Sequence, residues 1–109
     1  MHMVTELTGE TFDEFVAGNG IAVIDCWAPW CGPCRRMTPV MEQLSAELEG
    51  VAGVAKLNVD ENHAVSVRFG IRAIPTLLIF RDGVLAETLV GLRTKEDIKG
   101  YVETMLHER

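Results

Sequence analysis

Hydrophobic residues along the chain follow spacings that predict five strands. The apolar runs at 21–27 and 76–80 are continuous, as in strands buried between two helical layers. An Asp-Gly pair at 82–83 separates the second run from the strand at 84–90, which predicts a hairpin of antiparallel strands. A short strand near 4–6 is weakly marked.

The fifth strand, 54–60, alternates between apolar and polar residues. Ala55, Leu57 and Val59 share the face that we predict to be buried. Lys56 and Asn58 share the opposite face, which this pattern predicts to be polar.

Four segments with helical spacing lie between and after these strands. The first segment is capped by Thr8 or Thr11 and is followed by Gly18. The other three segments cover about 31–49, 62–69 and 94–106. The side chains predicted to face the core are Phe12, Phe15 and Val16 in the first segment, Met37, Met41, Leu44 and Leu48 in the second, and Ile98, Val102 and Leu106 in the fourth.

The predicted order is β-α-β-α-β-α-β-β-α, in a single domain over 1–109. Strand–helix–strand units favour parallel pairing through right-handed crossovers, and the hairpin adds antiparallel strands. We therefore predict an α/β fold with a mixed central sheet and helices on both faces; the pattern does not give the strand order. We interpret Met1–Met3 as residues added at cloning or as a disordered N-terminus.

Composition and charge narrow the function. The net charge of −6 argues against nucleic-acid binding, which requires clustered Lys and Arg. No run of about 20 apolar residues is present to span a membrane, and the N-terminus has no basic and apolar signal-peptide pattern. We therefore expect a cytoplasmic protein, and a monomer because no signal for oligomers is seen.

The chemistry is concentrated in the segment 27–34, Trp-Ala-Pro-Trp-Cys-Gly-Pro-Cys, which follows a buried strand and opens a helix. At a helix N-terminus, unpaired N–H groups and the helix dipole favour a Cys31 thiolate, the form that attacks disulfides. Cys34 lies on the same helical face, close enough to form a disulfide with Cys31. Gly32 leaves room beside the nucleophile, and Pro33 suits the first helical turn.

These positions suggest a mechanism and leave two other interpretations open. The Cys31 thiolate attacks a partner disulfide, and Cys34 then resolves the mixed disulfide. A zinc half-site would need two more ligands, and His2, His63 and His107 are scattered, so we expect no metal. A static structural disulfide is disfavoured by the exposed setting at the start of a helix.

At these residues the chain resembles the thioredoxins, from about Val4 to Leu106. The matching residues are the 27–34 segment, Asp25, Pro39, Lys56, Ile74-Pro75-Thr76 and Val90-Gly91. The resemblance implies a central mixed sheet of five strands flanked by four helices. It also implies that no cofactor is bound and that the Cys31–Cys34 disulfide is the only redox group.

The resemblance assigns a role to Asp25, a carboxyl in a buried strand, where its pKa is expected to rise. By resemblance it lies beneath Cys34 and accepts the proton of that thiol. The alternatives are a structural Asp or one paired only with Lys56. Lys56 resembles the lysine that tunes this carboxyl, and a solvated strand lysine fits equally well.

Pro75 matches the cis-proline of the family, opposite the disulfide. By resemblance, the Ile74 backbone pairs with an extended client peptide. The resemblance also implies a docking surface, and we keep this name for the residues Trp30, Gly32, Pro33, Ile74, Pro75, Val90 and Gly91. The alternative for Val90 and Gly91 is simply the end of a strand and a turn.

Cys26 stands where an aromatic residue is usual in the family. We expect a buried, inert thiol on the sheet face opposite Asp25, with a regulatory thiol as the alternative. The pair Arg35 and Arg36 supports the Cys31 thiolate, guides acidic partners, or is a solvated helix face.

The leading interpretation is a general protein-disulfide reductase that serves disulfide-containing client proteins. By resemblance, its electrons come from a thioredoxin reductase, an NADPH-dependent flavoprotein. Two alternatives stay open: a disulfide oxidase or isomerase of the same fold, and a binding module that holds clients without electron transfer.

Overall fold

The computed structural model describes residues 4–108, and it confirms the predicted order of strands and helices. The strands are β1 (Thr5–Leu7), β2 (Ile21–Trp27), β3 (Gly53–Asn58), β4 (Thr76–Arg81) and β5 (Val84–Val90). The helices are α1 (Phe12–Ala17), α2 (Gly32–Glu47), α3 (His63–Arg68) and α4 (Lys95–His107). The interpretation of Met1–Met3 lies outside the described residues.

The strands form one mixed sheet in the order β1-β3-β2-β4-β5. The central strand β2 runs parallel to β3 and antiparallel to β4. The ends of β2 and β3 and the start of β4 therefore meet at one edge of the sheet, where Trp27 pairs with Asn58 and Cys26 with Thr76. This edge brings together the segment after β2, the segment after β3 and the segment before β4.

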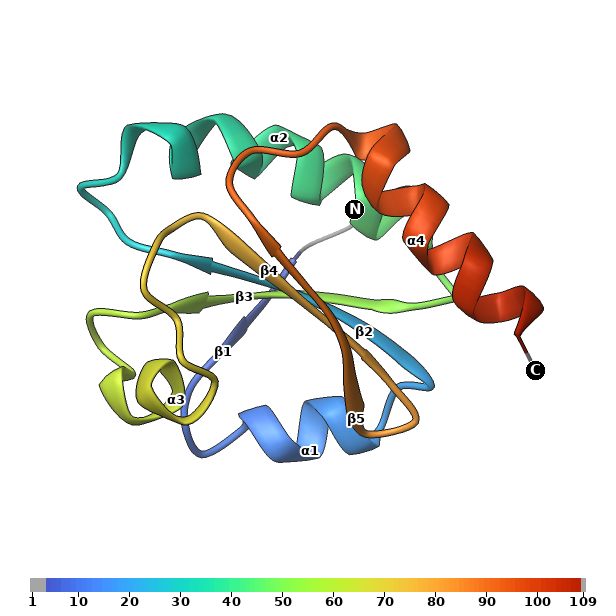
Figure 1. Cartoon of the computed structure of the whole chain (residues 1–109), viewed down its shortest axis with the longest axis horizontal. Coiled ribbons are helices and arrows are strands. Elements are labelled where there is room, and N and C mark those ends of the chain that lie inside the picture. Colours follow the sequence, from blue (N-terminus) through green and yellow to red (C-terminus); the bar gives the residue numbers. More distant parts are fainter. Residues whose placement is uncertain (1–3, 109) are drawn as a thin grey trace.

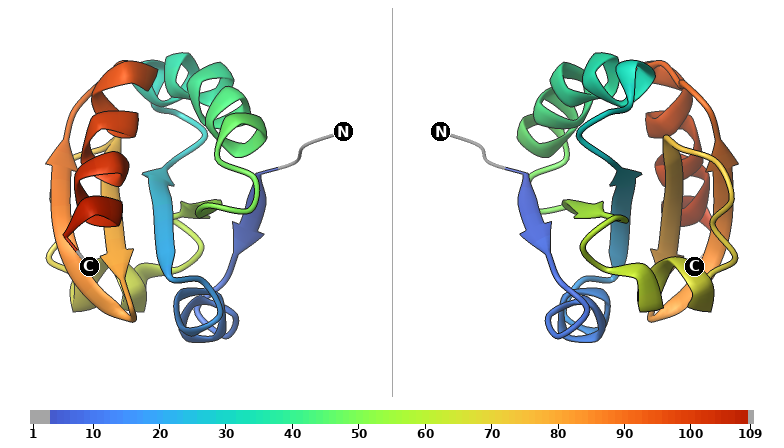
Figure 2. Two further views of the ribbon diagram at one scale, coloured as in Figure 1. Left: turned by 90° about the vertical axis from the view of Figure 1, so that its right-hand side faces the viewer. Right: turned by 90° about the vertical axis from the view of Figure 1, so that its left-hand side faces the viewer.

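Helices cover both faces of the sheet, as the sequence predicts. α2 and α4 lie on one face, and α1 and α3 lie on the other (Figures 1 and 2). The molecule measures 35 × 26 × 25 Å. Along its longest axis the β2–α2 turn lies at one end and the end of α4 at the other (Figure 1).

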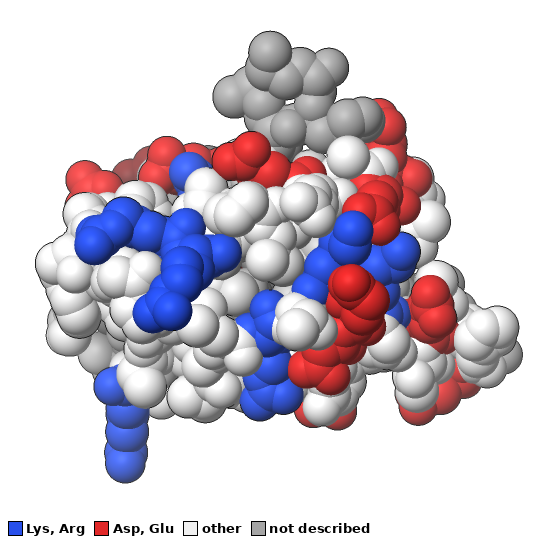
Figure 3. Space-filling view, turned by 90° about the horizontal axis from the view of Figure 1, so that it is seen from above, with Lys and Arg blue, Asp and Glu red and all other residues white. Residues whose placement is uncertain are grey.

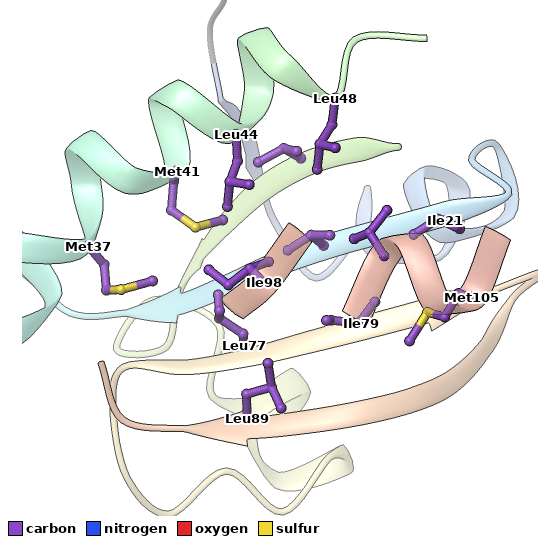
Figure 4. Close-up of a cluster of buried hydrophobic side chains, with 13 residues drawn as sticks. Ile21, Met37, Met41, Leu44, Leu48, Leu77, Ile79, Leu89, Ile98 and Met105 are labelled. Carbon is purple, nitrogen blue, oxygen red and sulfur yellow. The ribbon is translucent and has the colours of Figure 1, made fainter. Parts of the chain in front are cut away.

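The face under α2 and α4 buries aliphatic and methionine side chains (Figure 4). The predicted stripe of α2 is confirmed, because Met37, Met41, Leu44 and Leu48 are all buried against the sheet. Each such side chain, once buried, contributes about 1.5–3 kcal/mol. This stripe fixes how α2, and with it the cysteine pair at its start, sits on the sheet.

The face under α1 and α3 contains an aromatic group instead. The rings of Phe12, Phe69 and Phe80 lie with their centroids 5.2–5.8 Å apart, two of the three pairs edge to face. Such pairs add about 0.5–1.5 kcal/mol beyond the area that they bury.

The predicted core face of α4 is wrong at its last residue. Ile98 and Val102 are buried as predicted, but Leu106 is 41% exposed and Met105 is buried in its place. Because 3.6 residues complete a helical turn, the direction shared by Ile98 and Val102 passes closer to position 105 than to position 106.

The polar face predicted for β3 is only partly correct, because α2 covers that side of the strand. Asn58 is buried, and its Oδ1 accepts hydrogen bonds from the backbone N–H groups of Asp60 (2.9 Å) and Glu61 (3.3 Å). The strand ends at Asn58 rather than at Asp60. The Asn58 side chain is thus used to turn the chain out of the sheet.

The predicted hairpin joins β4 and β5 through Asp82 and Gly83. Their φ angles of 50° and 83° fit a type I′ turn, in which both central residues have positive φ. Over residues 4–108, no helix has the length and apolar character needed to cross a membrane.

Candidate active site

Cys31 and Cys34 form a disulfide at the start of α2. Their Cα atoms lie 5.2 Å apart, within the range that a disulfide requires. The exposed setting predicted for the pair is wrong for the cysteines themselves, because both are almost fully buried, with 4% and 2% of their surface exposed. A client disulfide must therefore approach closely and in one orientation to reach the sulfur atoms.

Cys31 occupies the N-cap position of α2. Its Sγ accepts a hydrogen bond from the backbone N–H of Cys34 at 3.2 Å, where a Ser or Asp side chain would normally accept it. Pro33 in the first turn has no N–H that would need a partner. The N–H of Cys34 and the positive end of the helix dipole both favour negative charge on the Cys31 sulfur.

The segment before β4 lies against this sulfur. The Ile74–Pro75 peptide bond is cis, as the resemblance implies. Sγ of Cys31 lies 3.8 Å from the carbonyl oxygen of Ile74. The backbone N–H of Gly91 donates to the carbonyl of Pro75 at 2.8 Å and ties the end of β5 to the same place. Three segments far apart in the sequence thus meet around the disulfide.

Exposure differs among the residues of the docking surface. The side chains of Trp30 and Val90 are 68% and 56% exposed, and Pro33 is also exposed. Gly32, Ile74 and Gly91 are half-buried, and Pro75 is buried. The accessible part of this surface is therefore mostly apolar and surrounds a nearly buried disulfide.

Asp60 also belongs to this site, although the sequence pattern did not indicate it. Its Oδ2 accepts a hydrogen bond from Nε1 of Trp30 at 2.9 Å, which fixes the position of the exposed indole. Asp60 follows β3, and the parallel pairing of β2 and β3 brings the ends of both strands to one edge. Parallel pairing was predicted, but the adjacency of these two strands was not, so the contact could not be deduced.

Asp25 lies on the sheet face that α2 covers. Its register partner on β4, Leu77, packs in the same cluster as Met37 of α2. Within residues 4–108, Oδ1 of Asp25 is buried without a hydrogen-bond partner. Burial raises the pKa of this carboxyl to about 7, although the nearby Lys56 ammonium acts in the opposite direction.

Lys56 is the register partner of Asp25 on β3 and lies on the same face of the sheet. Its Nζ is 5.4 Å from the centre of the Trp27 ring, a cation–π distance. The side chain is partly exposed, so it brings positive charge toward Asp25 without itself being buried.

Cys26 points to the opposite face of the sheet, as predicted. It is fully buried among the residues of the α1 and α3 face. Burial, and to a lesser degree the charge of Asp25, raises the pKa of this thiol to about 12. A thiol with such a pKa carries almost no thiolate at neutral pH, which fits the expected inert role.

Comparisons with known proteins agree with this geometry. The Thioredoxin family model matches residues 3–104. Thioredoxins of Staphylococcus saprophyticus and Staphylococcus aureus are 37% and 40% identical to the chain over 103 residues, which cover 94% of this chain and 98% of each relative. A solved structure of a mutant thioredoxin from Halobacterium salinarum superposes with a TM-score of 0.87 at 37% identity, covering 93% of this chain and 88% of that one.

The disulfide, the helix start and the comparisons thus converge. The fold is the thioredoxin fold, with the five-stranded mixed sheet and four helices that the resemblance implied. The chain belongs to the thioredoxin family of thiol–disulfide oxidoreductases and is a protein-disulfide reductase.

Proposed function

We propose that Cys31 is the nucleophile and Cys34 the resolving thiol of this reductase. The observation that carries the proposal is the N-cap position of Cys31, whose sulfur receives the N–H of Cys34. The Cys31 thiolate attacks one sulfur of a client disulfide, forms a mixed disulfide and releases the other sulfur as a thiolate. The Cys34 thiolate then attacks Sγ of Cys31 and releases the second client thiolate. The client gains two electrons, and the chain is left with the Cys31–Cys34 disulfide.

Asp25 is the group that accepts the proton of Cys34 before the second step. A carboxyl with a pKa of about 7 exchanges protons readily near neutral pH. It lies on the sheet face beneath α2, the helix that carries Cys34. Lys56 tunes Asp25, since its positive charge favours the ionised carboxylate that can take up the proton.

Clients bind to the docking surface. The carbonyl of Ile74, next to the Cys31 sulfur, offers an acceptor to an extended client backbone. Trp30, Pro33 and Val90 supply exposed apolar area beside it. Few side-chain-specific contacts are needed on such a surface, which suits a reductase with many clients.

A thioredoxin reductase returns electrons to the Cys31–Cys34 disulfide, and family membership supports an NADPH-dependent flavoprotein in this role. The disulfide is the only redox group, with no bound cofactor or metal.

The chain acts as a monomer, forms a single domain, works in the cytoplasm, and does not act on nucleic acid or at a membrane.

The reduction potential of the Cys31–Cys34 pair tests the direction of electron flow. We expect a value near that characteristic of thioredoxins, about −270 mV, when the pair is equilibrated with thiol buffers and free thiols are counted. A value near about −120 mV, typical of a strong oxidant, would contradict the reductase and favour the oxidase alternative.

Single cysteine variants test the two roles. With Cys34→Ser, the mixed disulfide between Cys31 and a client has no resolving thiol, so it accumulates and appears as a larger species on non-reducing gels. With Cys31→Ser, no such species forms. The double variant with Ser at both positions tests the binding-module alternative. That alternative is favoured if the variant still binds clients and the native chain does not accelerate the reduction of those clients.

A further inference from the structure

A groove lies beside the docking surface, between α2 and the segment that joins β5 to α4. Its volume is about 440 Å³. The lining residues that matter here are apolar (Met37, Val40, Leu92) and cationic (Arg36, Arg93, Lys95). An apolar floor with cationic side chains around it fits a peptide segment better than it fits a small neutral molecule.

The groove lies next to the docking surface, because residues of the two are adjacent in the sequence. Leu92 follows Gly91 directly, and Arg36 comes two residues after Cys34. From Cys31 to Arg36 the rise along α2 is about 7.5 Å. An extended peptide covers that distance in two or three residues. A client cysteine at Cys31 therefore places its own neighbours at the groove.

Positive charge gathers at this end of the molecule. Arg36 is exposed and forms no ion pair with any residue from 4 to 108. Arg35 donates to the neutral carbonyl of Pro29 at 3.0 Å, so its charge also stays uncompensated. In Figure 3, the large group of Lys and Arg at the left of the face is surrounded mainly by uncharged residues, below a row of Asp and Glu, whereas farther right Lys and Arg lie directly against Asp and Glu.

The remaining charges of the groove are largely balanced. Arg93 pairs with Asp97 at 3.3 Å, Glu47 is shared by Lys95 (2.8 Å) and Lys99 (2.9 Å), and Glu96 also lines the groove. The chain as a whole carries a net charge of −6, which repels acidic clients. That repulsion is screened over about 8 Å at physiological salt. The attraction of a client carboxylate into the groove therefore comes mainly from Arg36.

We propose that this groove selects clients that carry an Asp or Glu two residues, and an apolar side chain four residues, from the cysteine attacked by Cys31, because these two side chains of an extended peptide lie on the same side. The apolar side chain packs on Val40 and Leu92, and the carboxylate pairs with Arg36. The selection rests on the proposed function, because the client must approach the sulfur atom of Cys31.

Two disulfide-containing peptides test the selection. They are identical except for Glu or Gln two residues after the cysteine, with Leu four residues after it. The second-order rate constant for reduction by the reduced chain is measured for each peptide. We expect the Glu peptide to react about two- to fivefold faster in low salt, the range of one solvent-exposed ion pair, and the advantage to shrink in 0.5 M NaCl.

Two variants of equal charge locate the effect. Arg36→Gln should bring the ratio of the two rates close to one. Arg68→Gln changes the net charge equally, but Arg68 lies on α3, on the other face of the sheet, and the ratio should persist. If both variants lose the preference for the Glu peptide equally, the preference comes from the overall charge of the molecule, and the proposed role of the groove is contradicted.

Charge reversal gives an independent readout. Arg36→Glu should prefer a Lys peptide over the Glu peptide, provided that its circular dichroism and melting temperature match the native chain. Equal rates for the Glu and Gln peptides with the native chain would overturn the selection while leaving the thiol chemistry intact. Failure to reduce either peptide would instead contradict the proposed function.

Discussion

The two faces of the central sheet bury different chemistry at almost the same place. Asp25 and Cys26 are neighbours on β2, both nearly free of solvent contact, yet they point to opposite faces. On the α2 face, a carboxyl sits among aliphatic side chains with one oxygen unpartnered in the described part of the chain. On the α1 and α3 face, a thiol sits near three packed aromatic rings.

The difference shows where the fold accepts an energetic cost. Burying a carboxyl without full hydrogen bonding is unfavourable, whereas a thiol behaves as a small hydrophobic group. The unfavourable group lies on the face that carries the redox helix, whereas the thiol on the other face packs among apolar neighbours. Substitution of Asp25 should therefore alter both stability and chemistry, whereas substitution of Cys26 should alter stability alone.

Replacement of the nucleophile is expected to have the largest effect. Cys31→Ser should lower the rate of client disulfide reduction to the rate measured without the protein, because a neutral hydroxyl cannot take part in thiol–disulfide exchange. The assay follows the release of client thiols with excess external reductant. Cys26→Ala is the matched control, and residual activity in Cys31→Ser would show that another group attacks the client.

Asp25 should give the next largest effect, visible as a pH dependence of stability. Its pKa is about 7 in the folded chain and 3.8 for the ordinary carboxyl expected in the unfolded chain. Between these pH values the folded state holds a proton that the unfolded state has lost, so stability falls as the pH rises. At about 1.4 kcal/mol per pKa unit, the loss amounts to roughly 4 kcal/mol by pH 8.

Asp25→Asn isolates this contribution, because the amide does not titrate. The measurement is urea unfolding of the oxidised chain at pH 4 and pH 8. From pH 4 to pH 8, the free energy of unfolding of the variant should rise relative to that of the native chain by up to roughly 4 kcal/mol. All other carboxyls titrate alike in both proteins and cancel in the difference. A difference that stays constant with pH would mean that Asp25 is ionised throughout this range.

Cys26 should give the smallest effect of the three. Cys26→Ser places a hydroxyl at a fully buried position without an evident partner and should lower the free energy of unfolding by about 1–3 kcal/mol. The rate of client reduction should stay within about twofold of that of the native chain. A rate that falls well beyond this while stability is retained would favour the regulatory alternative for this thiol.

Local pattern was sufficient for most of the fold. The continuous run at 21–27 became β2 with the same bounds, and Asp82 and Gly83 formed the predicted turn. The errors arose where tertiary contacts decide. Asn58 is buried because a helix covers that side of β3, and Leu106 is exposed because of a small angular offset along α4.

The site was predictable in its chemistry but not in its assembly. The cysteine spacing, between a buried strand and a segment with helical periodicity, indicated a disulfide at a helix start, and that is what the structure has. The strand order is not contained in periodicity, so the approach of Ile74 to Cys31 and the bond from Trp30 to Asp60 required the three-dimensional structure. The cis bond before Pro75 followed only from the resemblance, since most X–Pro bonds are trans.

The placement of the C-terminal helix has a practical consequence. α4 ends at the far end of the longest axis from the β2–α2 turn, in a molecule 35 Å long (Figure 1). A fusion partner, affinity tag or surface linker joined after α4 would thus leave the redox end of the molecule facing open solution. The chain should accordingly serve as an immobilised reductant on an electrode or resin when it is attached through its C-terminus.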